Sequence, residues 1–186
     1  MEPLDALLPA LAGRVIDVGE DRRGEPFARL DNDLYLHAVL LPGEGSVDTL
    51  HLQFYLFFNP DGSHARPTFE VLRDLLGLHL GYSLKFPGEF WGSPAVRVEL
   101  RRLRQASGWR DLSLALIRVK KPRPNLASAP RMWVRLAFPA AGWRHGDLVG
   151  SDWTTLSRQL VSLLDQIVRL LDMVRPRASA PPLHPH

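Results

Sequence analysis

Apolar residues alternate with polar residues along several stretches of this chain, as they do in strands that are buried on one face. The clearest case is segment 50–58, LHLQFYLFF, in which every second residue is leucine or phenylalanine. The same period of two predicts strands at Leu34–Leu41, Leu50–Phe58, Val96–Arg104, Leu112–Lys120 and Met132–Phe138. A shorter strand is expected at Arg14–Val18, before a polar turn over residues 19–24.

Three segments instead follow the helical period, with apolar residues three and four positions apart. They are a short helix at Leu4–Leu11, a middle helix at Thr68–Leu80 that follows Pro67, and a long terminal helix at Asp152–Val174. Ser151 stands where a helix N-cap belongs, and the terminal helix carries a wide apolar stripe. Loops are expected at Tyr82–Pro94 and Pro139–Gly150.

These elements predict an α+β fold: one domain over residues 1–176, with a mostly antiparallel sheet flanked by the middle and terminal helices. The turn chemistry of Pro42–Gly45 favours an antiparallel pair between the two strands that it joins. A chain of 186 residues is long enough for one substantial core. Residues 177–186 are rich in proline, and we expect them to form a disordered tail.

Composition limits the cellular location and the kinds of site that we expect for the protein. No apolar run approaches the roughly 20 residues that cross a bilayer, so no membrane association is expected. The acidic start of the N-terminus is not typical of a secretory signal. The chain has no cysteine, which excludes disulfides and thiolate metal sites and fits a cytoplasmic location.

Charge is distributed unevenly along the chain. The segment Val96–Phe138 holds eleven basic residues against Glu99 and Asp111, so it carries a formal charge of +9 in a chain of +3. Arginine suits phosphate recognition, because its planar fork binds oxygens in pairs and stacks on bases. A GC-rich genome would also favour arginine, but it does not explain why the charge gathers in one segment.

Tryptophans lie within or beside the same segment. Trp133 alternates with Met132 and Val134, which puts it on the strand face that carries Arg131 and Arg135. Exposed aromatic rings among arginines bind unpaired bases by stacking. The alternatives are that the indoles fill gaps in the core and that the arginines are only a solvated face.

The first functional hypothesis is therefore a nucleic-acid-binding accessory protein that favours single-stranded or locally opened DNA. Its binding residues would be Arg101, Arg102, Arg104, Trp109, Arg110, Arg118, Lys120, Lys121, Arg123, Arg131, Trp133 and Arg135. No cofactor is implied by this hypothesis.

Enzymatic chemistry has little support in the sequence. Phosphate-binding glycine loops and the G-x-S-x-G elbow are absent. His37 and His51 could face the same side of neighbouring strands, but no third ligand keeps a suitable spacing, so we expect structural roles for them. We therefore predict a non-enzymatic protein without a metal site.

The order of elements resembles the α/β domain of YbjN-like proteins and type III secretion chaperones. Three stretches carry the resemblance: LQFYLFF, RPTFEVLRDLLGLHLG and TTLSRQLVSLLDQIVRLLDMV. It implies a central antiparallel sheet flanked by helices in a domain that commonly dimerises. The second hypothesis is accordingly a chaperone-like protein-binding module, possible as a homodimer through the terminal helix. That helix could equally pack on its own sheet.

Overall fold

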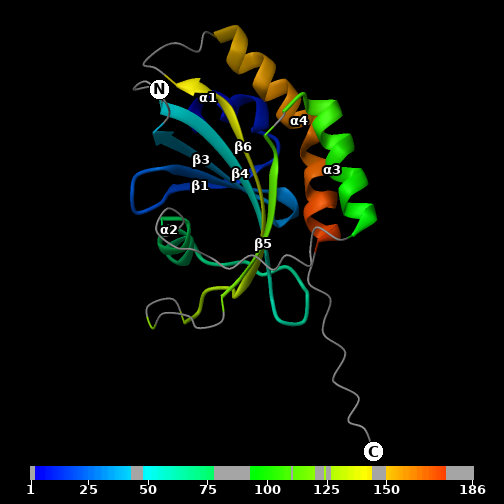
Figure 1. Ribbon diagram of the computed structural model, residues 1–186. Helices are drawn as coiled ribbons and strands as arrows, with labels where there is room; N and C mark the ends of the chain where they lie inside the picture. Colours follow the sequence, from blue (N-terminus) through cyan, green and yellow to red (C-terminus); the bar gives the residue numbers. More distant parts are fainter. Residues whose placement is uncertain are drawn as a thin grey trace, which may run out of the picture.

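Six strands form one antiparallel sheet in the order β1-β2-β3-β4-β6-β5 (Figure 1). This computed structural model describes residues 3–42, 48–77, 93–109, 111–119, 124, 127–143 and 150–174. The strands are β1 Val15–Glu20, β2 Pro26–Leu30, β3 Tyr35–Pro42, β4 Asp48–Phe58, β5 Ser113–Arg118 and β6 Met132–Trp143. All five strand pairs are antiparallel, which confirms the predicted α+β class.

Helices cover both faces of the sheet. They are α1 Pro3–Leu11, α2 Phe69–Gly77, α3 Pro94–Ser107 and α4 Gly150–Met173, and a short 3₁₀ turn, η1 Asp31–Asp33, joins β2 to β3. α1, α3 and α4 pack on one face, whereas α2 packs on the other (Figure 1). The short first helix, the middle helix and the long terminal helix were all predicted, but α4 begins at Gly150, so Ser151 lies inside the helix and not at its N-cap.

Strand register decides which side chains meet each helix layer. Leu36 pairs with Phe54, Phe54 with Leu136 and Leu136 with Leu114, so one apolar row crosses four strands under α1, α3 and α4. The residues next to these in each strand point their side chains to the opposite face, because successive side chains of a strand lie on alternate faces of the sheet.

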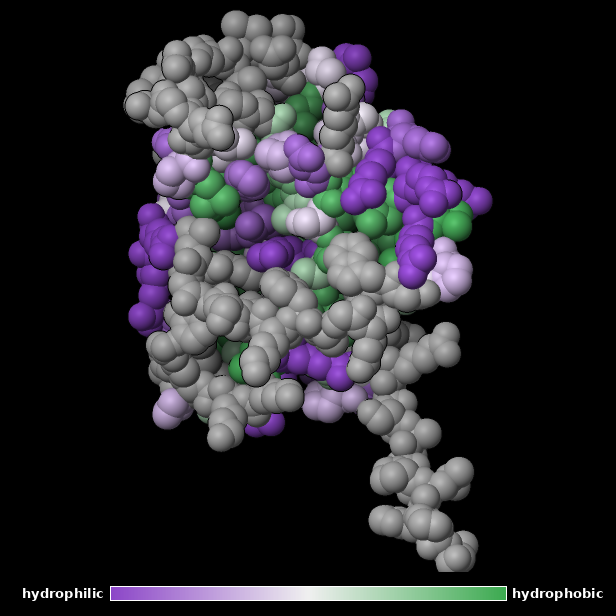
Figure 2. Space-filling model, in the orientation of Figure 1, coloured by the Kyte–Doolittle hydropathy of each residue, from purple (hydrophilic) through white to green (hydrophobic). Residues whose placement is uncertain are grey.

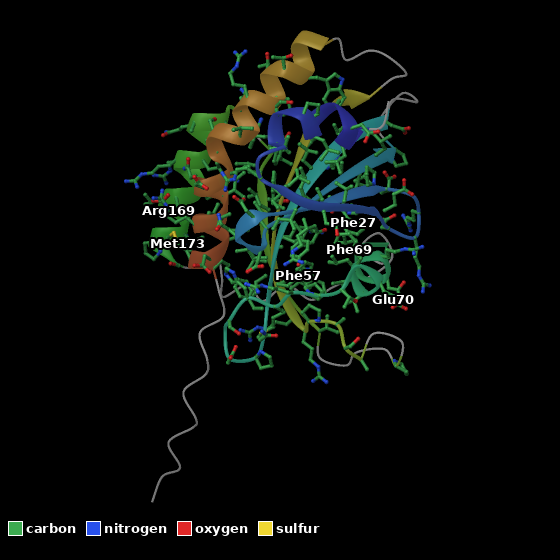
Figure 3. All side chains as sticks on the ribbon, turned by 180° about the vertical axis from the view of Figure 1, so that it is seen from behind. Phe27, Phe57, Phe69, Glu70, Arg169 and Met173 are labelled. Carbon is green, nitrogen blue, oxygen red and sulfur yellow. The ribbon has the colours of Figure 1, made fainter. Side chains whose placement is uncertain are left out.

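Aromatic rings dominate the face under α2. Phe57 lies 5.1 Å from Tyr35 and 5.9 Å from Trp133 between ring centroids. Phe27 meets Phe69 of α2 edge to face at 5.2 Å. Figure 3 shows Phe27, Phe57 and Phe69 on this side of the sheet, away from α3 and α4.

The apolar stripe of α4 packs within its own chain. Leu160, Leu164, Ile167 and Leu171 are fully buried, and α4 contacts α1, α3, β4 and β6. Burying one such side chain contributes roughly 1.5–3 kcal/mol. Of the two expected uses of this stripe, packing on the chain's own sheet is the observed one, and a homodimer stays a prediction.

The predicted strand Val96–Arg104 is wrong, because residues 94–107 form α3. Val96, Leu100, Leu103 and Ser107 are buried at helical spacing, whereas Val98 is 41% exposed. Pro94 opens the helix, where its missing N–H costs nothing, and Gly108 ends it at φ 72°, donating its N–H to the Arg104 carbonyl at 2.9 Å. Val96, Val98 and Leu100 fit a period of two only by coincidence.

Other boundaries differ at the ends of elements. β2 was not predicted, and β6 continues through residues 139–143, where a loop was expected, by pairing with β4. The first strand runs two residues beyond Val18, as β1, and β5 is shorter than Leu112–Lys120. Most of the expected loop at 82–94 and the expected tail at 177–186 lie outside the described residues.

Candidate nucleic-acid interface

The outward side of α3 is lined with arginines. Arg97, Arg101, Arg102 and Arg104 are exposed, while the other side of the helix packs on α4 and the sheet. Residues three and four apart are neighbours on a helix, so Arg97, Arg101 and Arg104 form a row along α3. Figure 2 shows hydrophilic side chains gathered over α3.

One carboxylate links this row to α4. Glu99 accepts hydrogen bonds from Arg102 at 2.8 Å and from Arg169 of α4 at 3.2 Å. Arg169 lies on the outer side of the helix layer in Figure 3. We call Arg97, Arg101, Arg102, Arg104 and Arg169 the arginine surface. α3 itself carries four arginines and one glutamate, so it keeps a positive formal charge.

The arginine surface lies beside the sheet edge formed by β5. Arg104 donates from Nη2 to the carbonyl of Leu112 at 3.0 Å, which fixes the end of α3 to the start of β5. Its charge in the last helical turn also favours the helix dipole. Arg118 at the end of β5 and Arg131 before β6 are exposed.

Neither described tryptophan of the basic segment is an exposed stacking platform. Trp133 is 2% exposed and packs in the aromatic core under α2. Trp109 is half-buried and stacks on Phe138, with ring centroids 4.0 Å apart. This packing favours the alternative that these indoles fill the core over their interpretation as base-stacking groups.

Arg135 does share a sheet face with Arg131 and Trp133, as predicted, but that face is not open. Arg135 is half-buried and hydrogen bonds to the hydroxyl of Tyr55. The basic residues that are exposed thus lie on a helix and not on the expected sheet face. Arg101, Arg102 and Arg104 belong to this helix surface, whereas Trp133 is buried and Arg135 is half-buried in the sheet.

Arg135 belongs instead to a row of polar side chains buried across the sheet. Tyr55 donates its hydroxyl to Gln53 Oε1 at 2.6 Å, and Nδ1 of His37 lies 3.4 Å from the same oxygen. Nε2 of His37 lies 3.1 Å from Oδ2 of Asp21. The polar row, Asp21, His37, Gln53, Tyr55 and Arg135, is a continuous hydrogen-bond network.

Asp21 is held as a carboxylate despite its burial. Burial, the strongest single influence, acts to raise its pKa, but hydrogen bonds from His37 and from the backbone N–H groups of Glu25 and Arg23 together lower the pKa below its ordinary value. Burial raises the pKa of Tyr55, so its hydroxyl stays protonated. The row therefore links the buried carboxylate of Asp21, through His37 and Gln53, to the hydroxyl of Tyr55.

A cavity of about 250 Å³ adjoins the polar row, with His37, His51, Gln53, Ser113 and Arg135 among its lining. His37 and His51 do face the same side of neighbouring strands, as predicted. Burial lowers the pKa of His51. The described residues include no group of three or more side chains placed to hold a metal ion.

Sequence reasoning missed Arg97 and Arg169 as members of the arginine surface. A helical period for residues 94–107 would have placed Arg97 with Arg101 and Arg104. Asp21 was not singled out from the sequence for another reason: it lies in a polar turn, where carboxylates are common.

Four of the predicted binding residues lie outside the described residues: Arg110, Lys120, Lys121 and Arg123.

In a comparison with known proteins, no family model, no curated protein and no solved structure matches the chain. Among the described helices, none has the length and apolar character that a membrane span requires.

Proposed function

We propose that the protein binds nucleic acid through the arginine surface and recognises the phosphate backbone. The single observation that carries the proposal is that α3 exposes four arginines, two of which flank Glu99, and that Glu99 also accepts a hydrogen bond from Arg169 of α4. Guanidinium groups bind phosphate oxygens in pairs, and the counterions released by each contact supply much of the affinity.

The positions of the tryptophans refine this proposal. Trp109 stacks on Phe138 and Trp133 is buried, so neither offers an open platform for unpaired bases. Phosphate contacts position a nucleic acid without reading its sequence. Binding should therefore be independent of sequence, and a preference for single strands no longer has a structural reason among the described residues.

The test is fluorescence anisotropy with a labelled duplex and a labelled single strand at several salt concentrations. The test variant replaces Arg97, Arg101 and Arg102 with Gln; Arg104 is kept because it holds the carbonyl of Leu112. Each lost contact should lower the slope of log affinity against log salt by roughly 0.9 for a duplex and 0.7 for a single strand.

A matched control removes the same charge elsewhere. Arg23, Arg66 and Arg158 are exposed and lie outside the arginine surface, so their triple Gln variant should bind like the parent. Circular dichroism checks that both variants are folded. If the two variants bind equally at every salt concentration, net charge alone drives any binding and the proposed surface is wrong.

A further inference from the structure

The edge strand β1 differs from the arginine surface in both shape and charge. β1 ends the strand order, so β2 is its only strand partner among the described residues. Val18 is 48% exposed and Ile16 is 59% exposed on this strand. Edge strands have backbone N–H and C=O groups on their outer side that can pair with a further strand.

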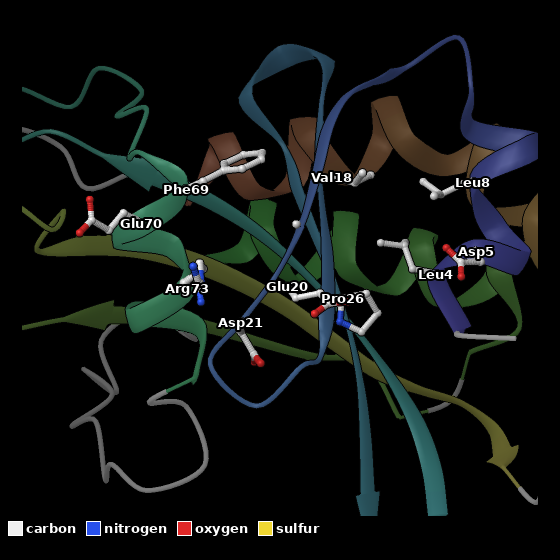
Figure 4. A pocket seen from close by; sticks show the side chains of 11 residues that line it. Leu4, Asp5, Leu8, Val18, Glu20, Asp21, Pro26, Phe69, Glu70 and Arg73 are labelled. Carbon is white, nitrogen blue, oxygen red and sulfur yellow. The ribbon is translucent and has the colours of Figure 1, made fainter.

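A groove runs beside this edge between two helices (Figure 4). Its volume is about 900 Å³; α1 forms one wall with Leu4 and Leu8, and α2 forms the other with Phe69 and Arg73. One end is fixed by the β1–β2 turn, where the N–H of Arg22 donates to the carbonyl of Arg73 at 3.3 Å.

The two walls face alternate sides of an added strand. Val18 pairs with Ala28, whose side chain belongs to the core under α1, whereas Gly19 pairs with Phe27, which packs against Phe69 of α2. Gly19 is required at this position, because a Cβ there would lie 2.8 Å from the Phe27 ring. Successive residues of a strand paired with β1 would thus point in turn toward α1 and toward α2.

The groove also has a charge opposite to that of the arginine surface. Asp5, Glu20 and Glu70 line it and are exposed, and Arg73 is the one exposed basic residue among its described lining. Asp21 lines it too but is engaged by His37. A polyanion would be repelled here, whereas lysine or arginine side chains would be attracted.

We propose that this groove binds an extended basic peptide, which adds a strand to β1. Backbone hydrogen bonds would supply affinity, and the two walls would select alternate side chains. A register shift at Ile16 interrupts the ladder, so regular pairing is confined to Asp17–Glu20 and the recognised segment is short. The occupant is a segment with small apolar residues that alternate with Lys or Arg. This proposal is independent of nucleic-acid binding, since it uses other residues and the opposite charge.

The experiment uses three fluorescein-labelled heptapeptides and the full chain. The first is Lys-Val-Arg-Val-Lys-Val-Arg, the second replaces every basic residue with Glu or Asp, and the third keeps the charge but has Pro in place of the central Val. We expect the basic peptide to bind, and the acidic and Pro-containing peptides to bind at least about tenfold more weakly. Amide chemical shifts of Asp17–Glu20 should move with the basic peptide.

Two substitutions on the same strand separate groove binding from general charge effects. Val18→Lys changes an exposed groove residue, and Ile16→Lys adds the same charge on β1 at a residue outside the groove lining. Val18→Lys should weaken the basic peptide about tenfold, whereas Ile16→Lys should change affinity little. Equal effects, equal binding of the three peptides, or no binding would overturn the proposal. The proposal would also be overturned if the protein self-associates and Val18→Lys makes it monomeric, because a second copy of the chain would then occupy the groove.

Discussion

Nε2 of His37 lies 3.1 Å from Oδ2 of Asp21, and both side chains are almost completely buried. The other ring nitrogen of His37 faces Oε1 of Gln53, so the imidazole lies between two oxygen acceptors from separate parts of the chain. The contact fixes the β1–β2 turn, which carries Asp21, against β3. That turn forms one end of the groove beside β1, and its stability therefore matters for the proposed docking site.

Replacing Asp21 with Asn should destabilise the fold and alter its pH dependence. Losing a charged acceptor in a buried network costs roughly 1–3 kcal/mol. Because folding lowers the pKa of Asp21, its contribution is present above the unfolded pKa of about 3.9 and is lost as pH falls through the lower folded value. Urea unfolding between pH 2 and 7 measures this. The variant should lose less stability than the parent on acidification, while Asp111→Asn, at an exposed site, should follow the parent.

The two buried tyrosines should respond differently to the loss of their hydroxyl groups. Tyr55 donates to Gln53, so Tyr55→Phe leaves that acceptor with one donor fewer and should cost roughly 0.5–1.5 kcal/mol. The hydroxyl of Tyr35 is buried and has no hydrogen-bond partner in the described part of the chain, so Tyr35→Phe should be neutral or stabilising. Denaturant unfolding of the matched pair decides this. A larger loss for Tyr35→Phe would contradict the network.

The helical register of α3 can be tested with two neighbouring apolar residues. Leu100 is 5% exposed and Val98 is 41% exposed, although a strand would put both on one face. Leu100→Ala should cost roughly 2–5 kcal/mol, and Val98→Ala should cost less than about 0.5 kcal/mol. Similar losses at the two positions, measured by denaturant unfolding, would favour the strand over the helix.

The terminal helix should show the same contrast between buried and exposed positions. Leu160 and Leu164 are fully buried, so replacing either with Ala should destabilise the fold by roughly 2–5 kcal/mol. Val161 is 38% exposed and serves as the control. Val161→Ala should change the stability of the fold little, because alanine also favours a helix.

Thermal unfolding at two protein concentrations would also reveal a dimer, because the unfolding midpoint of a dimer rises with protein concentration.

Oligonucleotide affinity should be insensitive to Trp133. The indole is 2% exposed, so Trp133→Phe removes no stacking surface and should leave both the affinity and its salt dependence unchanged. Anisotropy titration of the folded variant measures both. A large loss of affinity without loss of fold would restore Trp133 as a base-stacking residue and contradict its placement in the core.

Several features of the candidate site could be read from the sequence only in part. The concentration of arginine in Val96–Phe138 pointed to residues that α3 does expose, such as Arg101 and Arg102. The concentration of arginine did not distinguish these residues from Arg135, whose side chain is half-buried. The distribution of charge along a chain does not show which side chains are exposed. Trp133 illustrates the same gap, since the alternation that placed it on a face could not show that α2 covers that face.

Periodic apolar runs were enough to predict the strands from Leu34 to Phe58 and at Met132–Phe138, and the helices on either side of them, because a long periodic run allows only one buried face. The sequence left α3 ambiguous, since Val96, Val98 and Leu100 fit two periods and only packing against α4 selects one. Tertiary structure alone brought Asp21 to His37, Arg169 to Glu99 and α1 to one side of the β1 edge with α2 on the other. These contacts join residues far apart in the chain, and their energies depend on strand order and helix placement, which no local pattern encodes.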